Sequence, residues 1–166
     1  MKLHKRIYLF IIPILFLSCS QKTENLQQKF EREFEESKLK IAGKEYKIQT
    51  FPDWKAKAYF NHNKAILIFE ETMPEIGFTS QRIYCDEMGT EIVKIVYRKC
   101  LPNWKEDNYK LYDSTFVIYS KSNLVESYFG NKLVVSSKKI KFSRRVIEEA
   151  KYIKKQVEGI TAANSG

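Results

Sequence analysis

Residues 56–71, AKAYFNHNKAILIFEE, contain the pattern from which the fold can be predicted. Two runs rich in aromatic and aliphatic residues, 56–61 and 64–71, flank the polar tripeptide Asn61-His62-Asn63. Runs of this length are typical of strands, and asparagine tolerates the left-handed backbone that a tight turn needs. The stretch therefore predicts a β-hairpin.

Strand-like runs separated by short polar turns continue on both sides of this hairpin. Further turns are predicted at Ala42-Gly43-Lys44, Glu87-Met88-Gly89 and Gly130-Asn131, and a longer polar loop at 102–113. Successive strands joined by short turns form an antiparallel meander. We expect strands at residues 39–42, 45–51, 56–61, 64–71, 80–85, 91–99, 114–121, 124–129 and 132–142.

Helical periodicity replaces this pattern at both ends of the predicted sheet. In the segment 24–38, a narrow apolar stripe is formed by Leu26, Phe30 and Phe34, which recur every four residues. A second helix is predicted at 144–158, with Ser143 as its N-cap and Gly159 as its C-cap. Its apolar face consists of Val146, Ala150, Ile153 and Val157, with Ile147 beside them.

The expected fold class is α+β: an antiparallel β-meander sheet flanked by an N-terminal and a C-terminal helix, in a single domain over residues 24–160. The C-terminal helix is expected to cover one face of the sheet, because an apolar sheet face must be hidden from water. Residues 161–166 have nothing to bury and are expected to form a disordered tail. A composition of 43% hydrophobic and 30% charged residues is that of a folded domain rather than a disordered chain.

The N-terminus has the pattern of an export signal. A basic start, Lys2 to Arg6, precedes the apolar run 7–17, which is shorter than the roughly 20 residues of a spanning helix. The stretch Leu17-Ser18-Cys19 resembles the lipobox of bacterial lipoproteins, although Phe16 stands where that family usually has Leu. The alternatives are a plain secretory signal followed by an unrelated cysteine, or a short membrane anchor.

The lipobox resemblance implies that residues 1–18 are a signal peptide and that Cys19 is acylated, on its thiol and on its new amino group. Residues 19–23 would then form a lipidated tether, with membrane lipid as one partner of the chain. Ser20 follows the cysteine where the family's sorting rule uses Asp to retain a protein in the inner membrane, so the outer membrane is implied. Three of the 29 basic residues and none of the 20 acidic ones precede Cys19, so 26 and 20 remain, a net charge of +6.

Two kinds of internal repetition are present. The stretch from Tyr128 to Val134, YFGNKLV, resembles the hairpin repeats of the MORN type, and related patterns occur at Tyr59-Phe60 and Ile83-Tyr84. Together with a lipobox, such hairpins are similar to those of small envelope lipoproteins. A second repetition, at an offset of 50 residues, indicates either a duplicated half-sheet or coincidence. It pairs 51–55 with 101–105, 66–69 with 116–119, and 82–83 with 132–133.

Cys85 and Cys100 are candidates for a disulfide, since an oxidising envelope permits one. A straight hairpin turning at 87–89 would, however, separate them by on the order of 30 Å, against the about 6 Å between Cα atoms that a disulfide needs. Buried free thiols are the alternative. After residue 18 the chain has one histidine, His62, expected at an exposed hairpin tip, so no metal site and no cofactor are predicted.

Charge is divided between two regions of the chain. Residues 67–91 carry six acids, including Glu70, Glu71, Glu75, Asp86 and Glu87, against one arginine. Such carboxylates either serve acid–base chemistry or lie on solvated strand ends. Residues 132–155 carry nine basic and two acidic side chains, a net charge of +7. We expect this basic region, above all Lys138, Lys139 and Lys141, to meet anionic lipid or an acidic partner, or else to form a solvated face.

Trp54 and Trp104 each lie two residues after a proline, in predicted loops or strand starts. They are candidates for a partner-binding surface, or for covering the open edge of the core. With no catalytic motif in the sequence, the leading hypothesis is a non-enzymatic, membrane-anchored envelope lipoprotein that binds another protein. The alternatives are an immunity or inhibitor lipoprotein that neutralises a toxin or a wall-degrading enzyme, and a small carboxylate-dependent hydrolase. Nucleic acid is not an expected partner of an exported chain.

Overall fold

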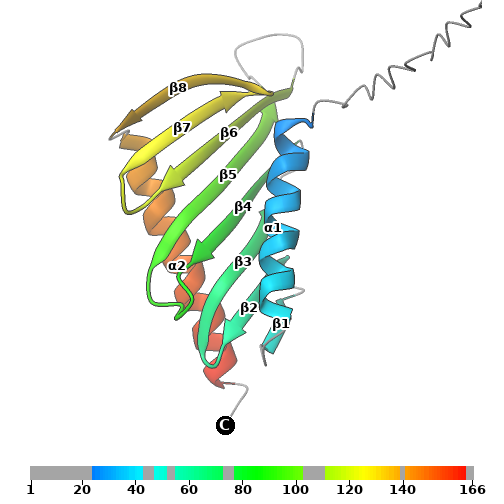
Figure 1. The fold of residues 1–166 in the computed structure, drawn as a ribbon, viewed down its shortest axis with the longest axis vertical. Helices are drawn as coiled ribbons and strands as arrows, with labels where there is room; N and C mark the ends of the chain where they lie inside the picture. Colours follow the sequence, from blue (N-terminus) through cyan, green and yellow to red (C-terminus); the bar gives the residue numbers. More distant parts are fainter. Residues whose placement is uncertain are drawn as a thin grey trace, which may run out of the picture.

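The computed structural model describes residues 24–42, 47–51, 55–72, 77–102, 111–138 and 141–163. Within these ranges one helix precedes the strands and another follows them (Figure 1). In chain order the elements are α1 (Leu26–Ala42), β1 (Lys47–Phe51), β2 (Ala56–Asn61), β3 (Lys64–Thr72), β4 (Phe78–Cys85), β5 (Ile92–Pro102), β6 (Leu111–Tyr119), β7 (Leu124–Phe129), β8 (Lys132–Lys138) and α2 (Lys141–Ala163).

The eight strands form one sheet in which each strand pairs antiparallel with the next along the chain, in the order β1 to β8. Its turns use the residues expected of them: His62, Gly89 and Gly130 have positive φ values of 53°, 64° and 56°. The predicted α+β class, an antiparallel meander with one helix before and one after it, is therefore confirmed.

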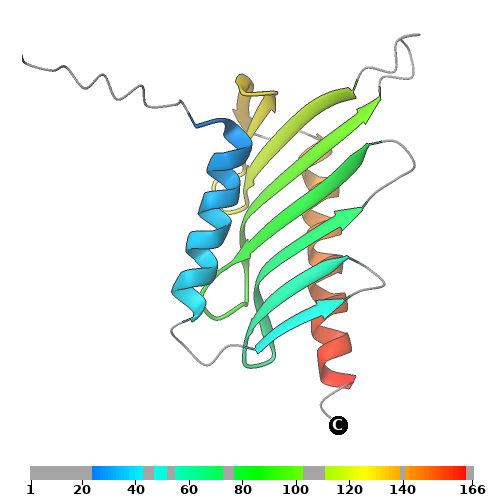
Figure 2. The same ribbon diagram turned by 90° about the vertical axis from the view of Figure 1, so that its right-hand side faces the viewer.

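The two helices cover opposite faces of the sheet, which makes three layers (Figure 2). In β5, Val96 faces α1 and contacts Phe30, whereas the adjacent Ile95 belongs to the cluster that packs against α2. In β3 the residues from Ala65 to Ile68 are all buried, since a strand covered on both faces has no solvent side. The sheet thus has two apolar cores, one on each face.

Both predicted helix stripes form these cores. Phe30 and Phe34 are 3% and 7% exposed on α1, and the Phe34 ring meets the rings of Tyr59, Phe69 and Tyr84 edge-on at 6.0–6.3 Å. On α2, the predicted face is buried against the centre of the sheet. It comprises Val146, Ala150, Ile153 and Val157, and Ile147 is partly buried beside it.

The predicted boundary of the first helix was wrong. Residues 39–42, predicted as a strand, continue α1. The reason is that Ile41 lies seven residues after Phe34, on the same helical face, and packs into the same cluster, while Leu39 is 73% exposed. Continuing the helix therefore packs Ile41 against the cluster and leaves Leu39 exposed to solvent.

The predicted boundaries of the second helix were wrong at both ends. The last strand ends at Lys138, and α2 begins at Lys141, because Phe142 precedes Val146 by four residues and packs against Phe116 and Tyr97. Ser143 is thus a buried residue in the first turn rather than the N-cap. Gly159 is not a C-cap either, since α2 continues to Ala163, into the segment expected to fray.

The 50-residue offset does not relate two equivalent halves of the sheet. Residues 66–69 and 116–119 both lie in strands, β3 and β6. However, β4 corresponds at this offset to residues 128–135, which span the turn between β7 and β8. Of the predicted loop 102–113, residues 103–110 lie outside the described residues, and β5 and β6 extend into its two ends.

Candidate interaction surfaces

The edge of the sheet at β8 carries an unusual amount of exposed apolar surface. Leu133, Val134 and Val135 are 48%, 59% and 42% exposed, and Phe129 at the end of the neighbouring β7 is 51% exposed. We call these four residues the β8 patch. Among the described strands β8 pairs with β7 alone, so its outer side has no partner in the sheet.

The register of β8 places a bulge within the three exposed apolar residues. Tyr128 of β7 pairs with Leu133 and Ser127 pairs with Val135, so Val134 is an extra residue in a β-bulge. Strand edges usually carry charges that prevent pairing with other chains. In β8 the lysines lie only at the two ends, Lys132 and Lys138, and no charge interrupts the five residues between them.

A second surface lies where α2 passes three turns of the sheet, those between β2 and β3, between β4 and β5, and between β6 and β7. Here an open groove of about 710 Å³ is lined by Lys64, Lys121, Lys151, Lys154 and Lys155. We call it the lysine groove. Glu91 and Glu158 are its acidic residues, Ile92 and Ile147 supply apolar surface, and Thr90 and Ser120 supply hydroxyl groups. Five lysines against two glutamates give the described part of the lining a formal surplus of three positive charges.

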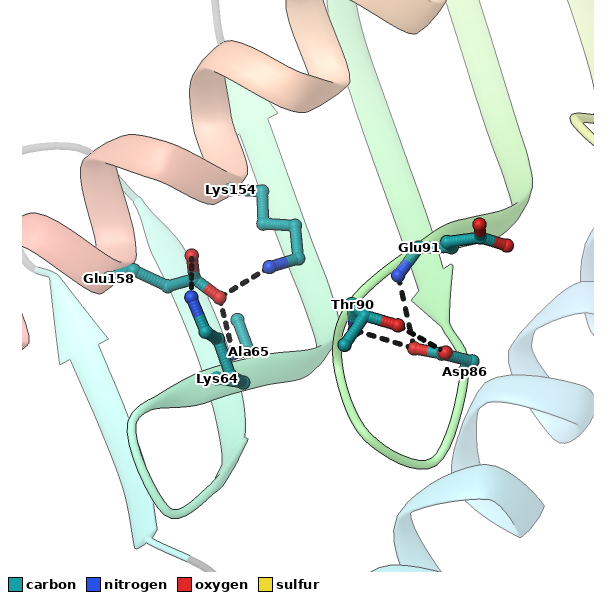
Figure 3. Close-up of polar contacts among 7 residues, drawn as sticks. All are labelled: Lys64, Ala65, Asp86, Thr90, Glu91, Lys154 and Glu158. Carbon is teal, nitrogen blue, oxygen red and sulfur yellow. Dashed lines mark hydrogen bonds and ion pairs between the residues drawn. The ribbon is translucent and has the colours of Figure 1, made fainter.

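Glu158 holds α2 against the β2–β3 turn (Figure 3). Its Oε1 accepts a hydrogen bond from the backbone N–H of Ala65 at 2.9 Å and another from the ammonium of Lys154. Its Oε2 lies 4.0 Å from Lys64 Nζ. Lys154 is 9% exposed and Glu158 is largely buried. The Glu158 carboxylate therefore binds groups of the protein itself.

Asp86 organises the neighbouring β4–β5 turn (Figure 3). Its carboxylate accepts hydrogen bonds from Thr90 N and Thr90 Oγ1, both at 2.6 Å, and from Glu91 N at 3.1 Å. The bond from the Thr90 hydroxyl, followed by the bond from the Glu91 backbone, lowers the pKa of Asp86 below its usual value. This acid therefore shapes the rim of the lysine groove without lining it.

Lysine residues in the groove differ in how strongly the protein neutralises them. Lys151 pairs with Glu148 at 2.8 Å and Lys121 with Glu91 at 3.9 Å, and all four of these side chains are well exposed. Exposed pairs of this kind contribute little free energy and exchange readily for another anion. Lys155 makes no ion pair with any residue that the structure describes.

Cys85 and Cys100 are both free thiols, so the candidate disulfide is not formed. In the β4–β5 pairing Cys85 lies opposite Ile92 and Cys100 lies opposite Phe78, at opposite ends of the same ladder. The straight-hairpin separation expected from the sequence is therefore the reason that they do not bond. Burial raises the pKa of Cys85 to about 12 and also raises that of Cys100, which makes both thiols poor nucleophiles.

The predicted acidic residues do not converge on one site. Glu70 and Glu71 are neighbours in β3 and so point to opposite faces of the sheet. Glu70 instead lines a smaller cavity of about 350 Å³ with Glu149 and Tyr152 of α2. Glu75 lies outside the described residues, and His62 is exposed at the tip of the β2–β3 turn. In the described part of the chain, no three metal-ligating side chains are grouped to hold an ion.

Several predicted interaction residues cannot be placed. Cys19, Trp54, Trp104 and Lys139 lie outside the described residues. Lys138 is the last residue of β8 and Lys141 the first of α2. As for the membrane, neither α1 nor α2, as far as the structure describes them, is long and apolar enough to cross one.

The sequence located only part of these surfaces. Lys151, Lys154 and Lys155 belong to the predicted basic region, but Lys64 and Lys121 come from distant turns and were not singled out. Another cation also went unnoticed: Lys94 lies under α1, 2.6 Å from Glu33 and within 6.0 Å of the rings of Phe30, Tyr84 and Tyr119. Its contacts are all within the protein, which indicates a structural role.

No protein-family model matches this chain, and neither a curated protein nor a solved structure matches it. Function must therefore be inferred from the surfaces described above.

Proposed function

We propose that this chain is a non-enzymatic binding protein of the bacterial envelope, anchored by lipid at Cys19, that pairs β8 with an extended segment of a partner protein. The observation that carries the proposal is the β8 patch: three successive exposed apolar residues on the unpaired edge of the sheet. Exposed apolar strand edges are the surfaces to which proteins add a strand from another chain. Backbone hydrogen bonds supply affinity in such pairing, and alternate side chains supply specificity.

Charge favours a different protein over a second copy as the occupant of this edge. In a symmetric antiparallel pairing centred on Val135, Lys132 of each copy would lie opposite Lys138 of the other. Like charges directly opposite each other destabilise a strand pair. A partner segment with apolar residues at its centre and acidic residues at its ends would match both the patch and the two lysines.

The non-enzymatic part of the proposal is supported by the arrangement of the candidate acids. Paired carboxylates act on one bond only when both face the same site. Glu70 and Glu71 face opposite sides of the sheet, and Asp86 is occupied by the hydrogen bonds of its own turn. We therefore favour binding over the carboxylate-dependent hydrolase.

The test is site-directed photo-crosslinking in the cell envelope. A photoreactive residue at Val134 should crosslink to one partner protein, and peptide mapping should place the crosslink in an extended segment with acidic ends. The same residue at Leu39, which is 73% exposed on α1, is the matched control and should give no such product. Val135→Lys should abolish the crosslinked product while Leu39→Lys leaves it unchanged, whereas equal capture at both positions would refute the role of β8.

The anchor is tested separately in the same cells. Cys19→Ala should prevent acyl labelling and leave the precursor unlipidated. Normal acyl labelling of this variant would refute the lipobox assignment without touching the β8 proposal. The identity of the crosslinked partner separates the two binding hypotheses, since a toxin or a wall-degrading enzyme would establish an immunity or inhibitor lipoprotein.

A further inference from the structure

The lysine groove offers a binding site that is independent of β8. Its walls come from α2, between Ile147 and Glu158, and from three turns of the sheet. A volume of about 710 Å³ lies within the range typical of small-molecule sites, about 300–1,000 Å³. Both its charge and its unused hydrogen-bonding capacity indicate what kind of ligand it would take.

The charge surplus remains after the internal ion pairs are counted. Glu158 forms ion pairs with Lys154 and Lys64. Glu91 pairs with Lys121 at 3.9 Å, a long distance for an ion pair. Lys151 is held by Glu148, an exposed residue outside the groove lining, and Lys155 makes no ion pair with the described residues. An anion in the groove would therefore meet two exposed ammonium groups, Lys151 and Lys155, one helical turn apart on α2.

The hydroxyl group of Ser120 points to the same conclusion. Ser120 lines the groove, and its hydroxyl oxygen is buried and has no hydrogen-bond partner among the described residues. Buried polar atoms are almost always partnered, so this hydroxyl has hydrogen-bonding capacity that the described residues do not use. This hydroxyl could donate to an anionic oxygen that the lysines hold.

The basic residues of the groove are lysines, which favours phosphate over carboxylate as the bound anion. Among the described residues, no arginine lines the groove, although Arg144 and Arg145 lie earlier on the same helix. Arginine suits carboxylates because its planar fork binds both oxygens, whereas lysine acts as a point charge and is a common phosphate ligand. Ile92 and Ile147 provide apolar surface for the uncharged part of a ligand.

We propose that the lysine groove binds a phosphate ester, either a soluble one or the headgroup of a phospholipid, through Lys151, Lys155 and the hydroxyl of Ser120. The proposal does not depend on the β8 surface or on its partner.

The first experiment is a titration of the chain from residue 20 onward, which contains all the described elements and lacks Cys19, with glycerol phosphate as the probe. Heteronuclear NMR should show shifts concentrated at Ser120, Lys151 and Lys155. The double variant Lys151→Glu/Lys155→Glu should weaken binding by about tenfold or more, because it removes both exposed cations. Arg144→Glu/Arg145→Glu makes the same change of charge on the same helix outside the groove, and should leave affinity within about twofold.

Ser120→Ala adds a readout that charge alone would not move. It removes a hydroxyl that has no partner in the protein, so thermal stability should be unchanged while affinity for glycerol phosphate falls several-fold. Unmoved groove resonances, or equal weakening by the two double variants, would overturn the proposal. Binding of a glutamate-rich peptide in the groove without binding of glycerol phosphate would overturn it in favour of an acidic protein segment.

Vesicles identify the source of the phosphate. Sedimentation with vesicles of phosphatidylcholine containing phosphatidylglycerol, compared with phosphatidylcholine alone, tests the lipid headgroup. Binding that requires phosphatidylglycerol and is lost in Lys151→Glu/Lys155→Glu supports a lipid ligand. Glycerol phosphate binding without vesicle binding supports a soluble phosphate ester.

Discussion

At the scale of single residues, glycine decides where the backbone can turn before β4 and between β7 and β8. Gly77 has a φ of 91°, and a Cβ atom at this position would lie 2.1 Å from the carbonyl oxygen of Cys100. Gly130 has a φ of 56°, but no atom lies within 4 Å of the position of its Cβ. A side chain at Gly77 would therefore meet both steric overlap and backbone strain, whereas one at Gly130 would meet backbone strain alone.

Gly77→Ala should lower the free energy of unfolding far more than Gly130→Ala does. The left-handed backbone costs an alanine about 1–2 kcal/mol, which is the full effect expected at Gly130. At Gly77 the overlap with a backbone atom adds to this strain, so a loss of about 3 kcal/mol or more is expected. Urea unfolding of both variants measures the difference, and equal losses would show that the close contact with Cys100 is absent.

The two cysteines give a second prediction at this scale. Burial raises the pKa of Cys85 to about 12 and raises that of Cys100 above its usual value, so almost no thiolate forms at neutral pH. The native chain from residue 20 should react slowly with a disulfide reagent such as dithionitrobenzoate. After denaturation without reductant, two thiols should react at once. Detection of none would show that Cys85 and Cys100 are bonded after all.

The raised pKa of Cys85 makes the stability of the fold decrease at alkaline pH. For Cys85 the pKa in the folded chain, about 12, is higher than the ordinary thiol value of 9.0. The contribution of Cys85 to stability is therefore constant below pH 9 and falls as the pH rises from 9 toward 12, because the unfolded chain loses this proton first.

At the scale of helices and strands, patterns local to the sequence were read correctly. The stripes of α1 and α2, the hairpin at 56–71 and the turns at His62, Gly89 and Gly130 depend only on neighbours in the chain. Element ends were missed where a distant contact decides them. Ile41 extends α1 because Phe34 has already placed the helix on the sheet, and Phe142 starts α2 early because Phe116 and Tyr97 lie beneath it.

The two candidate surfaces were beyond sequence reasoning for the same reason. The strand at 132–138 could be predicted, but its exposed edge follows from its place as the last strand of the sheet. Lys64 and Lys121 meet the lysines of α2 only because this helix passes the β2–β3 and β6–β7 turns. Composition showed that the C-terminal region is basic, and the topology shows which of its lysines share a groove.

The packing of α1 yields a prediction at this scale. Phe34 is 7% exposed and contacts three aromatic rings from β2, β3 and β4. Phe34→Ala should lower the free energy of unfolding by about 3–5 kcal/mol, the usual cost of emptying a phenylalanine site. Leu39→Ala, on the exposed side of the same helix, should change it by less than about 0.5 kcal/mol. If the two variants unfold alike in urea, α1 does not pack on the sheet as described.

At the scale of the whole molecule, helices on both faces leave the sheet few surfaces for other molecules. α1 and α2 cover the central part of the two faces, and the candidate surfaces described above lie at an edge and at the ends of strands (Figure 2). The β8 patch is such an edge, and the lysine groove lies at such strand ends. An apolar edge and a cationic groove suit different ligands, so one small domain has room for two binding functions.

The charge argument at β8 predicts a change of oligomeric state. The wild-type chain from residue 20 should sediment as a monomer, since full-length pairing of two β8 strands sets Lys132 opposite Lys138 and the chains carry like net charge. Lys132→Glu converts both contacts of the symmetric pair into attractions of opposite charges, each contributing up to about 1 kcal/mol. This variant should therefore form a dimer at concentrations where the wild type does not.

Two further variants decide whether such a dimer uses β8. Lys121→Glu makes the same change of net charge at a lysine that is 72% exposed but lies in the β6–β7 turn, and should remain monomeric. Adding Val135→Lys to Lys132→Glu should dissociate the dimer, because it places two cations at the centre of the paired strands. A dimer that persists in this double variant, or that also forms with Lys121→Glu, would mean that net charge rather than the β8 edge controls association. A Lys132→Glu variant that stays monomeric would show that the bulge at Val134 is sufficient to close this edge to pairing.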